Sequence, residues 1–421
     1  MGAKGVECAG YNQRTGMRAR TLSQSGSVFL DCVRFGTAMV VFVGHIGRYF
    51  SAKADLDRMD AWLAVRGVVI HSGDFIAHLL HIAVCVFFVL SGFVIRMITQ
   101  TRVTTMREFL IDRASRIYSV TAPALCLTLL LEAVSRATNP ALYLALSEPF
   151  RWQQVPLQFV TNLTFTAQCW GYETNPLSNS PFWSLSFECI YYLLFALLLF
   201  GAKRASVRVA VALVMLLAGP SIVLLFPTWL LGCLLYDVYI RLDAKTYGVA
   251  LATALLAAFL AAGFGARHWI GWLLNATEAP ERSVWLAKVV PAAVQRTFAD
   301  SNGVLPWLSR FSLSYYAAAI VVFVVMLWAL LMLDRFVPHV PRRLAAALRW
   351  IAEGTFSLYL LHVPLLMLIA CVVPAANAHR YLWCSAVVGV CILLSQPFSR
   401  LKLAMRRGLR HAFAAGAAPA R

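Results

Sequence analysis

The sequence predicts an all-α membrane protein, a polytopic bundle of about ten transmembrane helices. Hydrophobic residues make up 60% of its 421 positions and charged residues only 13%, and the mean hydropathy is +0.70. A soluble protein of this length could not bury so much apolar surface. The apolar runs are long and continuous, and they lack the alternation of period two that marks a transmembrane β-barrel.

The spans are assigned from apolar runs, each of which needs about 17–25 residues unless it is short or tilted. The sixth run is short, and a long segment with three prolines, 266–310, separates the seventh run from the eighth. The spans are expected at roughly 29–48, 78–98, 118–135, 182–201, 209–225, 227–240, 247–265, 311–333, 350–374 and 381–399.

Basic residues predict the orientation of the chain, whose net charge is +18. With the N-terminus inside, the inner segments hold about 24 Lys and Arg and the outer loops about 12, as the positive-inside rule requires. Both termini are therefore expected in the cytoplasm, as tails 1–28 and 401–421 around a membrane domain, 29–400. The first tail is polar and shows no cleavable signal peptide. The second is basic and is interpreted as an amphipathic helix on anionic lipid.

The first span, LDCVRFGTAMVVFVGH, contains ionisable residues where an apolar run should have none. Arg34 and His45 are eleven residues apart, so a helix places them on one face about 16 Å apart along its axis. Ionisable residues inside a membrane usually mark function. Alternatively, Arg34 reaches lipid phosphates beside Asp31, and His45 only makes a hydrogen bond between helices.

Two further segments are candidates for substrate contact. Ser91-Gly92 lies within the second span, where it permits either a close backbone approach or a kink. Arg113 and Arg116 lie in a predicted cytoplasmic loop before the third span. Their spacing would suit nucleotide phosphates, although a solvated basic loop explains either arginine alone.

The fourth and ninth spans add polar groups. Glu188 lies inside the fourth span and needs a partner, such as an arginine, a histidine or a substrate hydroxyl. Tyr192 follows one turn later, where an interfacial aromatic belt is the alternative. His362 lies in the ninth span, where hydroxyl residues flank it. Helix packing explains those hydroxyls better than it explains the histidine.

Histidines before and within the second span allow two interpretations. His71, Asp74, His78 and His81 would share one face if the segment were one helix, and such side chains bind metals. We adopt the other interpretation, a polar lining of an outward-facing cavity, and no metal is predicted. The ten cysteines show no zinc spacing and are interpreted as packing residues.

With these residues in place, the chain resembles the acyltransferase-3 family of integral-membrane acyltransferases over roughly 28–400. Cys32, Cys85, Ser119 and Thr355-Phe356 depart from the usual residues, but no ionisable residue of the motifs is lost. The length after residue 400 indicates the form without a fused extracytoplasmic hydrolase-like domain. Five segments carry the resemblance in the family's order: LDCVRFGTAMVVFVGH, FFVLSGFVI, RASR, FWSLSFECIYY and GTFSLYLLH.

The resemblance implies transfer of an acyl group, usually acetyl, from cytoplasmic acyl-CoA to a hydroxyl of a carbohydrate or glycolipid acceptor. Arg34 and His45 fall on the family's Arg-x10-His motif, in which the histidine is catalytic. We expect His45 to act as general base. We expect Arg34 to guide the donor, and Glu188 to orient His45 or bind the acceptor.

Further roles follow from the same resemblance. Arg113 and Arg116 are expected to hold the phosphates of acyl-CoA, and Ser91 to donate to the developing oxyanion. Tyr192, His362 and His81 are candidates for contact with the acceptor or for support of the site. Acyl-CoA is a co-substrate here, and no bound cofactor is expected.

The expected surroundings are the lipid bilayer of a bacterial inner membrane, with no nucleic acid as partner. A transporter for a small anion or sugar is the alternative function, because it too would use intramembrane Arg, His and Glu. Against it stand the absence of obvious inverted repeats and the five motifs.

Overall fold

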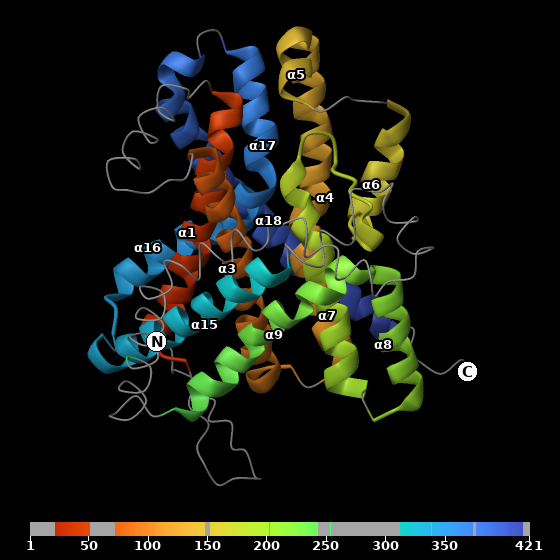
Figure 1. The fold of residues 1–421 in the computed structure, drawn as a ribbon, viewed down its shortest axis with the longest axis vertical. Coiled ribbons are helices and arrows are strands. Elements are labelled where there is room, and N and C mark those ends of the chain that lie inside the picture. Colours follow the sequence, from red (N-terminus) through yellow and green to blue (C-terminus); the bar gives the residue numbers. More distant parts are fainter. Residues whose placement is uncertain are drawn as a thin grey trace, which may run out of the picture.

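A computed structural model describes residues 22–50, 72–103, 105–147, 152–201, 203–242, 253, 312–337, 339–373 and 376–415. Within them the chain is a bundle of helices without strands, as predicted (Figure 1). Among the described residues, eight helices are long and apolar enough to cross a membrane. They are α1 (Gln24–Tyr49), α3 (Ser72–Thr101), α4 (Met106–Thr138), α7 (Trp183–Gly201), α9 (Pro220–Arg241), α15 (Ser312–Phe336), α17 (Thr355–Val372) and α18 (Arg380–Ala415).

The part of the chain that the structure describes also has four shorter α-helices: α5 (Pro140–Leu146), α6 (Val155–Leu163), α8 (Ala205–Ala218) and α16 (Arg342–Glu353). The predicted span 247–265 lies outside the described residues, except for residue 253. The first tail, predicted to end at residue 28, gives way to α1 at Gln24, where Ser23 caps the helix by accepting a hydrogen bond from Gly26.

The predicted spans 209–225 and 227–240 are wrong in their division. Gly219 has a φ of 84° and ends α8, and Pro220 starts α9 at a position that suits proline. The 14 residues of α8 rise only about 21 Å, too short for a hydrocarbon core of about 30 Å. The 22 residues of α9 are long enough, and Pro227 lies inside that helix.

Two other boundaries also differ. The ninth span begins at Thr355 rather than 350, because Gly354 separates α16 from α17. The last helix does not stop near 399, since α18 continues for 36 residues, about 54 Å, to Ala415. Most of the predicted tail 401–421 is therefore part of this helix, which packs against α4 and α17.

Helices α3 and α9 cross in very close contact. A Cβ on Gly92 would lie 2.0 Å from the carbonyl oxygen of Trp229, and one on Gly232 would lie 2.0 Å from that of Val89. Only glycine fits at both positions, as in other membrane helix pairs that meet through small residues. Of the two interpretations of Ser91-Gly92, the close backbone approach is therefore the one the structure shows.

Gly232→Ala is expected to lower the apparent melting temperature of the purified protein. The added Cβ forces α3 and α9 apart, and overpacking of this kind costs about 1–3 kcal/mol. Gly389→Ala in α18 is the matched control, because a Cβ there meets nothing within 4 Å. Alanine also favours helix, so the control should melt at the wild-type temperature or above it. Identical melting of both variants would contradict the close crossing.

Candidate functional site

A cavity of about 360 Å³ lies between α1, α3, α4, α7, α17 and α18. Its size falls in the range of small-molecule sites, although such sites are usually less charged. The lining brings together side chains from segments that are far apart in the sequence. It includes six of the nine predicted site residues, namely Arg34, Ser91, Arg113, Arg116, Glu188 and Tyr192.

Arg34 lines the cavity from α1. Its guanidinium makes an ion pair of 3.0 Å with Asp31, one turn earlier, and both side chains are partly buried. The Arg34 Nε atom is buried and has no hydrogen-bond acceptor among the described residues. Part of this cation's donor capacity therefore remains unused.

A polar network joins α3, α7 and α9 at the cavity wall. The Ser91 hydroxyl donates to Glu188 Oε1 at 2.9 Å, and the Tyr192 hydroxyl donates to the same carboxylate. Trp229 Nε1 donates to Ser91 Oγ at 3.1 Å. No hydrogen bond links Glu188 to His45 in the described part of the chain. The structure thus ties Glu188 to Ser91 and Tyr192 instead.

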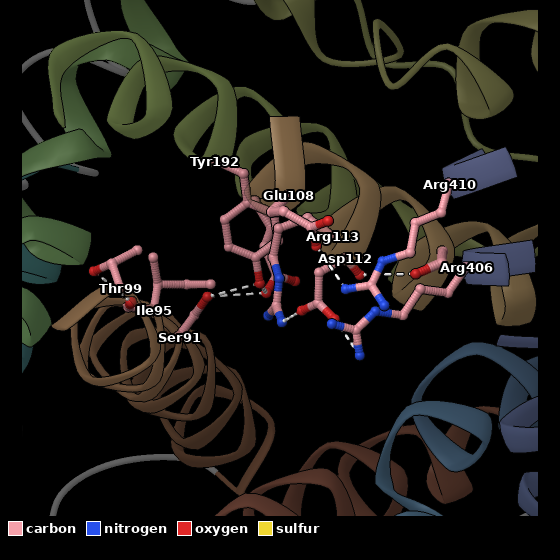
Figure 2. A network of polar contacts seen from close by, with 11 residues as sticks. Ser91, Ile95, Thr99, Glu108, Asp112, Arg113, Tyr192, Arg406 and Arg410 are labelled. Atoms are coloured by element: carbon pink, nitrogen blue, oxygen red, sulfur yellow. Dashed lines mark hydrogen bonds and ion pairs between the residues drawn. The ribbon is translucent and has the colours of Figure 1, made fainter. Parts of the chain in front are cut away.

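The Arg113 guanidinium contacts two neighbouring side chains. It forms an ion pair with Asp112, and its guanidinium lies 5.9 Å from the centre of the Tyr192 ring. Asp112 also faces Arg406 of α18, at 3.4 Å. Figure 2 shows Asp112 between these two arginines, with Tyr192 and Ser91 beside Arg113.

The prediction that Arg113 and Arg116 lie in a loop is wrong. Helix α4 begins at Met106, where Thr105 caps it by accepting a hydrogen bond from the Glu108 amide. Arg113 is only 7% exposed, and both arginines face the cavity from the helix. The Arg116 guanidinium makes no hydrogen bond or ion pair within the described residues. The charges of Arg34 and Arg113 lie close enough to repel it, and the Glu188 carboxylate attracts it.

His45 lies on α1 beyond the cavity lining and pairs with His362 of α17. His45 Nδ1 is 2.8 Å from the Val41 carbonyl oxygen, so the network assigns the proton to this nitrogen. His362 Nε2 lies 3.4 Å from the same Nδ1. His362 Nδ1 in turn lies 2.8 Å from the Leu358 carbonyl. His45 Nε2 is consequently left unprotonated, with its lone pair available.

His81 lies apart from both groups. Its ring packs edge-on against Tyr315, with centroids 4.6 Å apart. His71 lies outside the described residues, and so do the side chains of Asp74 and His78. Neither interpretation of this segment, the polar lining that we adopted or the metal site, is therefore tested.

Sequence reasoning missed the contribution of α18. Lys402 lines the cavity, and Arg406 and Arg410 form ion pairs with Asp112 and Glu108 of α4. These residues were assigned to a tail on the lipid surface. A spacing of four residues between the three basic positions was the signal, since it places them on one helix face.

Comparison with known proteins identifies the family of the chain. A family model described as an acyltransferase domain matches residues 27–396, which include every residue of the network around Glu188 and the His45–His362 pair. No curated protein and no solved structure matches the chain. Because the family match takes in most of the sequence, the chain belongs to the acyltransferase-3 family and is an integral membrane acyltransferase.

Proposed function

We propose that the protein is an O-acyltransferase that moves an acetyl group from acetyl-CoA to a hydroxyl of a surface carbohydrate, such as O-antigen. The observation that carries this proposal is the placement of three arginines around one cavity, with an available histidine further along the same helix α1. The cavity supplies binding for an anionic donor, and the histidine supplies a base. The proposed setting is a bacterial inner membrane with the cavity on the cytoplasmic side.

The donor would bind through its phosphates. Arg113 and Arg116 present guanidinium groups to the cavity from α4, and Arg34 presents a third from α1. Guanidinium binds phosphate oxygens in a bidentate manner, and such charge-assisted bonds are about twice as strong as neutral ones. An acyl-CoA held at this end would extend its long arm along α1 towards His45.

His45 would act as the general base through Nε2. This nitrogen takes the proton of the acceptor hydroxyl as the oxygen attacks the thioester carbonyl. The tetrahedral intermediate then collapses, so that the new ester forms and the C–S bond breaks. The leaving thiolate of coenzyme A receives the proton from His45. The Val41 carbonyl accepts the proton of His45 Nδ1, and His362 Nε2, 3.4 Å from that nitrogen, would support the reaction as a second acceptor that keeps His45 Nε2 free.

The hydrogen bonds of Ser91 and Glu188 limit the part that each residue could take in the reaction. The Ser91 hydroxyl has a single proton, which it donates to Glu188. Ser91 could donate a hydrogen bond to the oxyanion only if its hydrogen bond to Glu188 broke. Glu188 accepts the hydrogen bonds of Ser91 and Tyr192 at Oε1, which leaves Oε2 without a hydrogen-bond partner among the described residues. We therefore propose that Glu188 accepts a hydrogen bond from the bound donor or acceptor through Oε2.

The transporter alternative makes a different prediction for a simple assay. A transporter would move its solute without breaking a thioester. The proposed enzyme releases coenzyme A when the purified protein is mixed with acetyl-CoA and with glycan extracted from cells that lack the protein. Release of the thiol together with ester formation on the glycan supports the acyltransferase, and solute movement without thiol release supports the transporter.

His45→Ala is expected to lower kcat for acetyl transfer by about 10²–10⁴-fold, the range for loss of a general base. Acetyl-CoA binding should be retained, because His45 lies outside the cavity lining. The measurement is transfer of labelled acetyl to the extracted glycan, together with direct binding of acetyl-CoA. Wild-type turnover in this variant would remove His45 from the mechanism.

His362→Ala is expected to lower kcat by about tenfold with little change in KM, a smaller loss than that of His45→Ala, since only a positioning contact is removed. His362→Gln offers a side chain that can still accept a hydrogen bond and should recover part of the rate. If the alanine variant proves as inactive as His45→Ala while remaining folded, His362 takes part in proton transfer itself.

A further inference from the structure

Two of the four basic side chains that line the cavity form no ion pair among the residues that the structure describes. Arg34 pairs with Asp31, and Arg113 pairs with Asp112. Arg116 and Lys402 also line the cavity, yet neither side chain forms an ion pair or a hydrogen bond within the residues the structure describes. Cations that are partly removed from water and left unpaired are costly, so a pair of them indicates a missing anion.

Lys402 is held at this place by the helix that carries it. Lys402, Arg406 and Arg410 are spaced by four residues and share one face of α18. Arg406 contacts Asp112 at 3.4 Å, and Arg410 contacts Glu108 at 2.6 Å, so two consecutive turns of α18 are fixed to α4. Figure 2 shows both contacts side by side. Lys402 lies one turn before the first of them, at the cavity.

The charges around Lys402 also indicate that an anion is missing from the cavity. Its ammonium lies close enough to Arg116 and Arg113 to be repelled by them, and Asp112 only partly offsets this repulsion. Asp112 is already shared by Arg113 and Arg406. A lysine that served only to reach lipid headgroups would have no reason to line this cavity beside two arginines.

We propose that Lys402 is a donor-binding residue, which together with Arg116 holds a phosphate group of coenzyme A. This inference rests on the proposed function, because it takes coenzyme A as the donor's carrier. The two side chains suit one phosphate, since the arginine supplies a planar, bidentate fork and the lysine a compact point charge. Helices α4 and α18 would then close on the nucleotide end of the donor from two sides.

The test measures binding of coenzyme A to the purified full-length protein by titration calorimetry. Lys402→Ala is expected to weaken binding by about tenfold or more, the usual effect of removing a hydrogen bond to a charged group. Lys402→Arg keeps the charge and should retain most of the affinity. Arg407→Ala is the matched control, because Arg407 is an exposed cation on the same helix that does not line the cavity.

A second ligand separates phosphate binding from damage to the fold. Pantetheine carries the thiol arm without phosphates, so wild-type protein and Lys402→Ala should bind it equally. Equal coenzyme A affinity of wild type and Lys402→Ala would overturn the inference, and so would an equal loss of pantetheine binding. If Arg116→Ala alone weakens coenzyme A binding, the proposed function stands and the role of Lys402 falls. If wild-type protein does not bind coenzyme A, the proposed donor itself is wrong.

Discussion

Charges placed between apolar helices must be compensated, and this constraint organises the structure. Asp31 compensates Arg34, and Asp112 compensates both Arg113 and Arg406. Two of these pairs lie within a single helix, whereas the Asp112–Arg406 pair joins α4 to α18 and limits where these two helices can lie. The cavity lies beside these ion pairs, and basic side chains that form no ion pair among the described residues also line it. These side chains, Arg116 and Lys402, relate the packing of the bundle to the proposed binding of an anionic donor.

A second constraint is the close packing of α3 against α9. Gly92 and Gly232 allow α3 and α9 to approach until no Cβ could fit between them. This approach brings the indole of Trp229 to Ser91, which in turn holds Glu188. The close backbone approach thereby places the Ser91 hydroxyl, which holds the carboxylate together with the Tyr192 hydroxyl. Binding groups and positioning groups therefore come from different helix pairs, and each pair is fixed by its own packing.

The sequence predicted the class of fold and most of the polar residues that meet at the cavity, because intramembrane charges are rare and therefore informative. It did not predict the break at Gly219, which lies inside a continuous apolar run, or the helical start of α4. Lys402 was missed for a different reason. Its position depends on contacts such as Glu108–Arg410, whose partners are 302 positions apart. Local pattern cannot reveal such a contact, and a basic segment after the last span resembles a tail.

The central claim is that the cationic cavity holds the carrier of the acyl group at one end of α1, while His45 acts at the other. A structure of the full-length protein with bound acetyl-CoA tests this most directly. The claim predicts phosphate density against Arg116 and an acetyl thioester that extends along α1 to His45 Nε2. Phosphate density away from this cavity, or an acetyl group that points away from His45, would contradict it.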